Sequence, residues 1–388
     1  MPVSEAIEAL VDDARHWRHE IHKLPELLYD VEKTAKFVAD RLHAFGCDEV
    51  KMFIGRTGVV GVVKGRLGAG RTIALRADMD ALPIEERTNL PYRSAVPGKM
   101  HACGHDGHTA MLLGAARRLA KTRDFAGTAL FVFQPAEEGG AGAKAMLEDG
   151  LVERFGVDAF YGLHNWPGMP VGAFAIRSGP MMAAADRFTV RLEGKGGHAA
   201  MPHQARDVIV AGAAIITALQ SIVSRNIDPL HSAVVSVSKF AAGEVYGVLP
   251  QEAVLLGTVR SLTATTRDFL EKRFGEVVSG VAAAHGVEAE IDYVRGYPPL
   301  VNHAREAGFA ASAAEGIAGA ANVSREVAPT MGAEDFAYML EARPGAFIFM
   351  GNGDSAGLHN PSYDFNDDAL GFGMAYWTHL IETALAPA

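Results

Sequence analysis

GHTAMLLGAARRLAKTRDFAGTALFVFQPAEEGGAGAKAMLEDGLVERFGVDAFYGLHNWP, residues 107–167, contains in order a helical, a strand, a helical and a strand pattern. The same alternation extends from the N-terminus to about residue 180, with two further β-rich runs joined by a glycine turn at 59–77. Strands that alternate with helices predict an α/β fold with a mostly parallel sheet that helices cover on both faces. In such sheets, ligands bind beyond the carboxyl ends of the strands.

A different pattern fills the middle of the chain. It gives strand, helix, two strands, helix and strand, at 186–194, 205–223, 232–240, 252–262, 265–286 and 288–294. This βαββαβ order is typical of a ferredoxin-like domain. Because the first pattern resumes at 301–317, we predict a discontinuous domain at 1–184 and 296–388 with a small domain inserted at 185–295.

The composition indicates a globular protein of more than one domain. The chain has 388 residues, of which 49% are hydrophobic and 21% charged, and this length favours two domains. The net charge of −10 disfavours nucleic acid and anionic membrane surfaces as partners, since both need clustered positive charge. We therefore expect neither a nucleic-acid partner nor a membrane partner.

Cysteine content and the N-terminus indicate the compartment. Cys47 and Cys103 are too few for a disulfide framework, which favours a reducing compartment and a cytoplasmic location. Residues 1–24 carry acids and apolar residues at helical spacing, and so predict a surface helix rather than a signal peptide. The sequence shows no run of about 18 uncharged apolar residues, so no membrane span is expected.

The densest group of chemically active residues is HACGHDGHTAM, at 101–111. If this segment is an extended strand exit, Cys103 and His105 point to one face, because side chains two apart share a side. Thiolate and imidazole are preferred ligands of zinc and similar metals. Taken alone, the segment fits a metal site and a set of capping or exposed histidines equally well, and for His108 we favour the capping or exposed role.

A second group is the acidic pair Glu137 and Glu138, which follows the apolar strand in FVFQPAEEGG. Two adjacent carboxylates at a strand end repel each other unless a cation or a shared proton compensates. One of them can bind a metal while the other transfers protons. An isolated pair of this kind would usually be a solvated loop, but the histidine-rich segment one helix upstream makes that reading less favourable here.

Two further histidines follow predicted strands. His164 lies in GLHNWP at the next strand end, and His359 lies in AGLHNPSYDFND after the apolar strand AFIFMGNG. A lone loop histidine is more often a surface residue than a ligand. With Glu138 as the ligand of the acidic pair, the candidates number five, which suits two metals that share a bridge: Cys103, His105, Glu138, His164 and His359.

Two motifs are misleading. GDSAG at 353–357 matches a G-x-S-x-G nucleophile elbow, but the elbow must open a helix and the following LHNPSYDFND has no apolar periodicity. GAGAKA at 140–145 resembles a dinucleotide fingerprint, but the two glutamates before it would repel a pyrophosphate. We therefore predict neither a serine nucleophile nor a dinucleotide site.

Nearly the whole chain resembles the M20 metallopeptidase family, in its branch of hippurate hydrolases, N-acyl-amino-acid amidohydrolases and auxin-conjugate hydrolases. Segments along the whole length carry the resemblance, and these are RHEIHKLPELLYDVEKTA, ALRADMDALPI, MHACGHDGH, FQPAEEGGAGAKAM, GLHNWP, GKGGHAAMPH, GTVRS, MGAEDFAY and GLHNPSYDF. The resemblance implies a two-metal catalytic domain with an inserted lid domain that usually mediates dimerisation. A homodimer or higher homo-oligomer is therefore expected.

The resemblance also implies roles for individual residues. It makes the same five residues the metal ligands and Glu137 the general base. His198, in the lid, matches a histidine that helps to stabilise the oxyanion, in some relatives from the neighbouring subunit. Asp80 is similar to an aspartate beside the metals, and Arg260 to a lid arginine that grips the substrate in some relatives. Gly247 departs from the family, which commonly has an asparagine there, so a side-chain amide that reaches the substrate is missing.

Together these features predict hydrolysis of the amide bond of N-acyl amino acids by a metal-activated water, with Glu137 as base. The leading alternative is a dipeptidase or aminoacyl carboxypeptidase of the same family. A non-catalytic metal-dependent binding protein is the alternative from another class, but binding alone needs no second carboxylate beside Glu138. Thiolate and imidazole favour zinc, while hydrolases with such ligands often use manganese, cobalt or nickel. We expect two divalent ions, manganese or zinc, with cobalt or nickel as alternatives.

Overall fold

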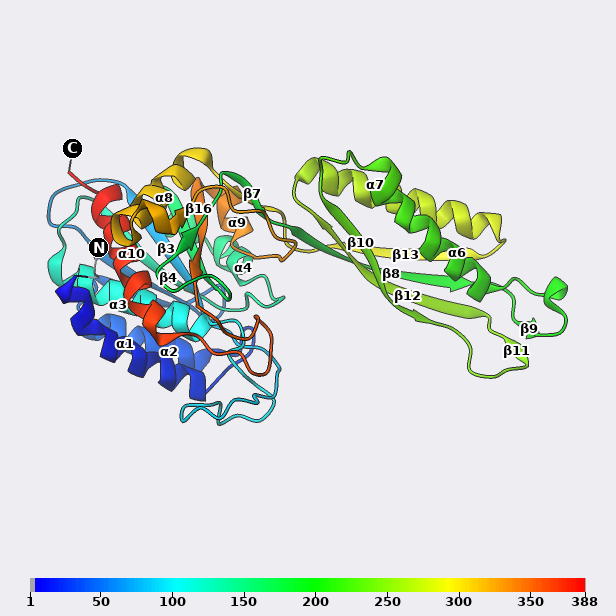
Figure 1. Cartoon of the computed structure of the whole chain (residues 1–388), viewed down its shortest axis with the longest axis horizontal. Coiled ribbons are helices and arrows are strands. Elements are labelled where there is room, and N and C mark those ends of the chain that lie inside the picture. Colours follow the sequence, from blue (N-terminus) through cyan, green and yellow to red (C-terminus); the bar gives the residue numbers. More distant parts are fainter. Residues whose placement is uncertain (1–3, 388) are drawn as a thin grey trace. The chain divides into compact units, whose positions relative to one another are not determined.

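The computed structural model describes residues 4–387, which form two compact units (Figure 1). The large unit contains the chain up to Gly179, Val301–Ala328 and the chain from Asp335 onward; the small unit contains Pro180–Leu300 and Pro329–Glu334. The small unit thus extends beyond the predicted 185–295 and includes a short segment that the prediction left in the other domain. Backbone hydrogen bonds hold that segment, for example from Ala183 N–H to Gly332 C=O at 2.8 Å. Local sequence patterns do not show such a long-range pairing.

An eight-stranded sheet forms the centre of the large unit, in the order β1-β2-β4-β3-β5-β16-β6-β15. The neighbours β4, β3, β5 and β16 run parallel, while β2 joins them antiparallel. The predicted mostly parallel α/β sheet is confirmed. The strands are β1 (Glu49–Ile54), β2 (Gly58–Lys64), β3 (Thr72–Asp78), β4 (Thr128–Gln134), β5 (Ala159–Trp166), β6 (Phe174–Ala175), β15 (Val323–Ser324) and β16 (Gly345–Gly351).

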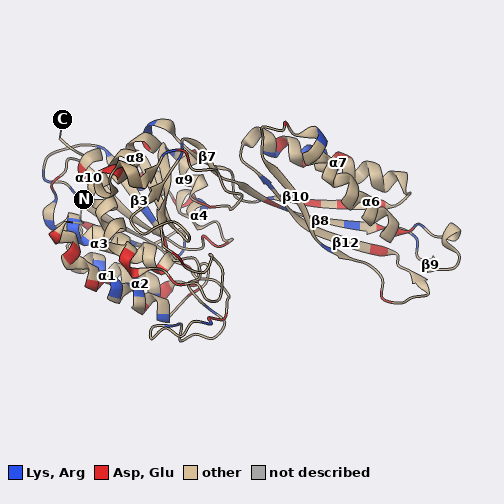
Figure 2. Cartoon of the chain, viewed as in Figure 1, with Lys and Arg blue, Asp and Glu red and all other residues tan. Residues whose placement is uncertain are grey.

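Helices cover this sheet and complete the core. Along α1 and α2, acidic and basic residues are mixed rather than separated by sign (Figure 2). The helix predicted at 1–24 is α1, which buries Ile7, Ala14 and Trp17, whereas residues 1–3 lie outside the described chain. The helices are α1 (Glu5–Lys23), α2 (Glu32–Ala44), α3 (His105–Thr122), α4 (Gly142–Glu148), α5 (Leu151–Phe155), α8 (Ala304–Ala318), α9 (Ala337–Ala342) and α10 (Leu370–Ala384).

The small unit is ferredoxin-like, as predicted, with an antiparallel sheet in the order β10-β12-β8-β13. Its helices α6 and α7 pack on one face through an apolar core that includes Phe188, Leu255 and Phe274. A separate two-stranded ladder pairs β9 with β11. The elements are β8 (Ala184–Glu193), β9 (Gly197–His198), α6 (Val208–Ser221), β10 (Ala233–Ala241), β11 (Val248–Leu249), β12 (Glu252–Ser261), α7 (Ala264–Ala284) and β13 (Glu288–Arg295).

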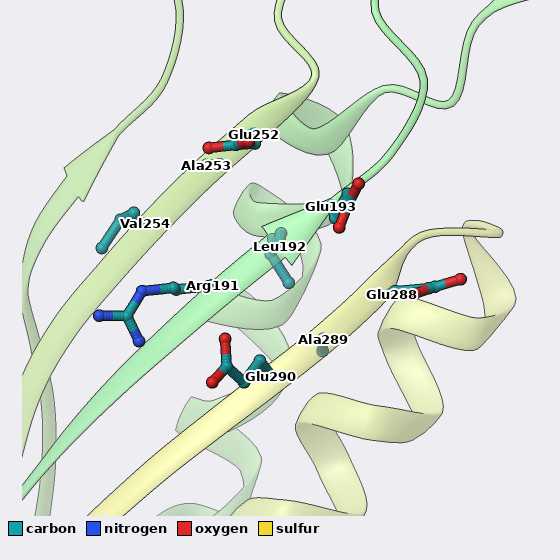
Figure 3. Close-up of a pocket in the computed structure, with 9 residues that line it drawn as sticks. All are labelled: Arg191, Leu192, Glu193, Glu252, Ala253, Val254, Glu288, Ala289 and Glu290. Carbon is teal, nitrogen blue, oxygen red and sulfur yellow. The ribbon is translucent and has the colours of Figure 1, made fainter.

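The opposite face of this small sheet is polar and carries a row of glutamates (Figure 3). Glu193 on β8 lies opposite Glu252 on β12 and also opposite Glu288 on β13. Like charges that face each other across strands destabilise their pairing. In the next row on this face, Arg191 lies opposite Glu290, so one positive charge lies beside the acidic row.

One helical stretch of the described chain, Val208–Asn226, is long and apolar enough to cross a membrane by length and composition. This differs from the sequence expectation, because the polar residues in the stretch do not lower its mean hydropathy enough. Val208, Ile215 and Leu219 are buried against the small sheet, as in a helix that packs on one side. Its other side leaves Val210 53% exposed.

A buried ionic network ties α1 to the start of α3. Asp106 accepts hydrogen bonds from Arg18 Nη1 at 3.1 Å and from His22 Nδ1 at 2.8 Å, and His22 Nε2 lies 3.3 Å from Glu86 Oε2. Burial lowers the pKa of His22, but the Asp106 and Glu86 carboxylates overcome this and raise it to about 9. His22 is therefore held as an imidazolium at neutral pH.

This network predicts a pH-dependent loss of stability. Because the folded pKa of His22 is above the unfolded value of 6.5, its contribution is fully present below pH 6.5 and is lost as the pH rises through about 9. At 1.36 kcal/mol per pKa unit, a rise from 6.5 to about 9 corresponds to a contribution on the order of 3 kcal/mol. Urea unfolding of metal-free protein at pH 6 and pH 9.5 should show this extra loss in the wild type and not in His22→Gln. Equal losses in both proteins would contradict the assignment.

Candidate metal centre

The five candidate ligands lie where strands of the large sheet end. Glu138 follows β4, His164 lies near the end of β5, and His359 lies in the loop after β16. Cys103 precedes α3, and His105 is its first residue. Because β4, β5 and β16 run parallel to β3, their carboxyl ends meet at one edge, which is where α/β sheets bind ligands.

A glycine turn, not a strand, presents Cys103 and His105. The extended geometry considered for this segment is wrong, because Gly104 adopts a left-handed conformation with φ of 86° immediately before α3. A Cβ atom at this position would lie 2.5 Å from Asn165 Oδ1 and 2.6 Å from Tyr363 Oη, so only glycine fits. The tight turn places the thiol and the imidazole on the same side of the helix start.

A second turn positions the two glutamates. After β4 and Pro135, Ala136 takes a left-handed conformation with φ of 55°, and a turn follows at Glu137 and Glu138. Asp80, fully buried, accepts the backbone N–H of Glu137 at 3.0 Å with one carboxylate oxygen and that of Glu138 at 3.1 Å with the other. One carboxylate thus fixes the backbone of both glutamates, and both side chains are largely buried.

The donor atoms form overlapping groups in which any two atoms lie within 4.8 Å of each other. One group is Cys103, His105 and His164, with Cys103 Sγ 3.3 Å from His164 Nε2. Another is Cys103, Glu138 and His359, with His359 Nε2 3.2 Å from Glu138 Oε1. A third is His105, Glu137 and Glu138. The structure thus brings all five candidates together, and Cys103 belongs to both of the first two groups.

Two of the histidines are oriented by backbone carbonyls. His105 Nδ1 donates to the carbonyl oxygen of Asp80 and His164 Nδ1 to that of Asn165, each at 2.7 Å. Each imidazole therefore presents Nε2 as the nitrogen available to a metal, as outer hydrogen bonds do in metal sites. His105 Nε2 is buried and has no hydrogen-bond partner in the described chain. The donor set thus fits a divalent cation.

The surroundings shift the pKa values of two of the candidate ligands, His105 and Cys103. Burial lowers the pKa of His105, but the carboxylates of Asp78, Asp80 and Glu138 raise it to about 10. Burial, with the nearby carboxylates, holds the pKa of the Cys103 thiol well above its usual range. A bound cation would reverse this preference, because coordination favours the thiolate.

His108 differs from the sequence expectation. It is neither a cap nor exposed, since only 2% of its surface is accessible. Its Nδ1 lies 2.6 Å from Asp78 Oδ1, and its Nε2 accepts the backbone N–H of Asn165 at 3.0 Å. Sequence reasoning also missed Asp78 and Asn165. Asp78 lies two residues before Asp80, and Asn165 directly follows His164, but neither position reveals these contacts.

The other two predicted residues belong to the small unit. His198 is exposed on β9, where its Nδ1 accepts the N–H of Ala200 at 3.1 Å, which leaves the proton on Nε2. Arg260 is half-buried on β12, opposite Ala185 of β8. Neither residue belongs to a donor group found among the described residues, so their predicted roles stay predictions.

Fold and donor set together define a protein with a candidate metal centre at the strand ends of an α/β unit and an inserted ferredoxin-like unit. The sequence model of "Peptidase family M20/M25/M40" matches residues 74–383. The chain belongs to this family.

Similar proteins include a hippurate hydrolase and an N-acyl-L-amino acid amidohydrolase. The chain is 44% identical over 363 residues to the hippurate hydrolase of Campylobacter jejuni, covering 94% of each chain. It is 45% identical over 305 residues to the N-acyl-L-amino acid amidohydrolase of Geobacillus stearothermophilus, covering 77% of this chain and 81% of the other. A Bacillus subtilis structure described as a dinuclear metal binding peptidase of the M20 family superimposes with a TM-score of 0.86 and 35% identity, over 97% of this chain and 99% of that one.

Proposed function

We propose that this protein hydrolyses the amide bond of N-acyl amino acids with two divalent cations, and that Glu137 is the general base. The observation that carries the proposal is the overlap of two donor groups through Cys103, beside a buried Nε2 of His105 that lacks a hydrogen-bond partner in the described chain. The dinuclear relative and the two amidohydrolases support it. The ligands are Cys103, His105, Glu138, His164 and His359.

The cations would supply an activated water at neutral pH and polarise the amide carbonyl. Glu137 would accept the proton of the attacking water and pass it to the departing amine. Glu137 shares a donor group with His105 and Glu138, and these two residues come one from each of the two groups that contain Cys103. His198, whose Nε2 carries a proton, would donate a hydrogen bond to the oxyanion. Asp80 would fix the positions of the two glutamates through their backbone N–H groups. Arg260 would bind the substrate.

The acyl group and the amino acid are best determined by a substrate panel. Metal-free protein would be reloaded with manganese, zinc, cobalt or nickel and assayed with hippurate, acetyl-amino acids and dipeptides. Amine release from the acylated substrates and slow cleavage of dipeptides are expected. Efficient cleavage of dipeptides alone would favour the dipeptidase alternative, and binding without turnover would favour the metal-dependent binding protein.

We also propose that the protein is a homodimer that associates through the small unit. The supporting observation is the exposed apolar side of α6, where Ile209 is 38% and Val210 53% exposed. Light scattering after size-exclusion chromatography should give about twice the chain mass of 41.2 kDa. Val210→Asp should shift the protein towards the monomer, because a charge placed in an apolar interface is costly. A monomeric wild type would contradict the proposal.

A further inference from the structure

We propose that His108 is a positioning residue that fixes His164 for one of the two metals, without binding metal itself. The inference rests on the two-metal function proposed above and goes beyond it, because it assigns a separate role to a histidine outside the five proposed ligands. It also predicts that the two metal positions respond differently to one substitution. A nitrogen of His108 does fall in a further donor group, with Asp78 and His105, so a role as a ligand is the alternative that the contacts of His108 must decide.

Both ring nitrogens of His108 are engaged within the protein. Nδ1 lies 2.6 Å from Asp78 Oδ1, so Nδ1–H is the donor, and Nε2 accepts the Asn165 N–H at 3.0 Å. Coordination of a metal by His108 would break one of these buried contacts. Breaking it would leave a buried polar group unpaired, at a cost of about 1–3 kcal/mol.

The contacts continue from His108 to His164 through Asn165. The backbone N–H of Asn165 binds His108, and its carbonyl oxygen accepts Nδ1–H of His164 at 2.7 Å. The rings of His108 and His164 also pack edge to face, with centroids 4.6 Å apart. His108 therefore sets both the position of the carbonyl that selects the His164 tautomer and the orientation of the ring.

The far end of this chain of contacts is firmly anchored. Asp78 lies at the end of β3 and accepts a hydrogen bond from the fully buried Arg76 at 2.8 Å, and Arg76 in turn lies 3.1 Å from Asp335. The Asn165 side-chain amide lies within hydrogen-bonding distance of His108 Nε2 and of the Tyr363 hydroxyl. His108 thus connects β3 to the end of β5.

The two donor groups should respond differently to the loss of His108. Only the group of Cys103, His105 and His164 contains the ring that His108 orients, whereas the group of Cys103, Glu138 and His359 does not. Loss of an outer hydrogen-bond partner typically weakens metal binding by about 10–100-fold. In His108→Ala, one of the two metals should therefore bind about 10–100-fold more weakly while the other is retained.

Calorimetric titration of metal-free protein with Mn²⁺ or Zn²⁺, with metal content after dialysis, would measure this. His108→Gln, whose amide oxygen can still accept the Asn165 N–H, should bind the affected metal more tightly than His108→Ala. If His108→Ala does not fold, the comparison of His108→Gln with the wild type serves as the test. The matched control is His101→Ala, since His101 is equally buried at 1% exposure and both its ring nitrogens lack hydrogen-bond partners in the described chain.

Each outcome decides the proposal. Selective weakening of one metal in His108→Ala, with both metals retained in His101→Ala, supports it. Unchanged binding, equal weakening of both metals, or the same loss in His101→Ala would overturn it, because each shows that His108 does not act through His164 alone. A wild type that binds no metal would instead refute the proposed function.

Discussion

Glu137→Gln is expected to lower kcat by at least about 10²–10⁴-fold while leaving two metal ions bound. Glutamine has nearly the same size as glutamate but cannot accept a proton, and general acid–base groups typically contribute this factor. Asp80 holds residue 137 through its backbone N–H, so the substitution leaves that contact intact. Metal analysis and steady-state kinetics on a good substrate from the panel would measure both effects.

The neighbouring residue provides the control for this experiment. Glu138→Gln changes a proposed ligand, so it should lose metal as well as activity, whereas Glu137→Gln should lose activity alone. Normal turnover in Glu137→Gln would refute its role as base. Loss of metal in that variant would instead show that Glu137 is a ligand.

Cys103→Ala is expected to reduce the binding of both metals. Cys103 Sγ is the one atom common to the two donor groups that contain His164 and His359, so its removal takes a ligand from each. Activity should fall by more than the roughly 10–100-fold that the loss of an outer partner costs. Metal content after dialysis, and activity at stoichiometric metal, would measure the effect.

The second cysteine makes a matched control. Cys47 is half-buried and belongs to none of the donor groups among residues 4–387, so Cys47→Ala should keep both metals and full activity. His359→Ala should lose one metal, because His359 belongs to a single group. Two metals retained in Cys103→Ala would show that the thiol is not a shared ligand.

Much of the fold could be predicted because its signals are local. The strand and helix patterns at 107–167 correspond to α3, β4, α4 and β5 within a few residues, and the βαββαβ order gave the ferredoxin-like unit. The exact limits of the small unit could not be predicted. Pro329–Glu334 belongs to the small unit because backbone hydrogen bonds link it to residues far away in the sequence. Local patterns do not show such links.

Side chains with metal-binding chemistry at strand ends could be found from the chain alone. In a parallel sheet those ends meet at one edge, so position along the chain was enough to make the Glu137–Glu138 pair, His164 and His359 candidates. It did not determine the turn before α3, where Gly104 avoids a clash with Asn165 and Tyr363. That turn depends on residues that the sequence places about 60 and 260 positions away.

The surroundings of the donor atoms, in contrast, become known only once the chain is folded. His108 has the same chemistry as His105 and lies one helical turn from it, yet its nitrogens are engaged by Asp78 and Asn165, whereas His105 keeps an Nε2 without a hydrogen-bond partner in the described chain. A histidine that can bind a metal keeps one ring nitrogen free of hydrogen bonds within the protein, whereas in a positioning histidine both ring nitrogens are hydrogen-bonded. The partners of His108 are Asp78 at the end of β3 and Asn165 on β5. A periodic pattern within one segment cannot predict contacts with other strands.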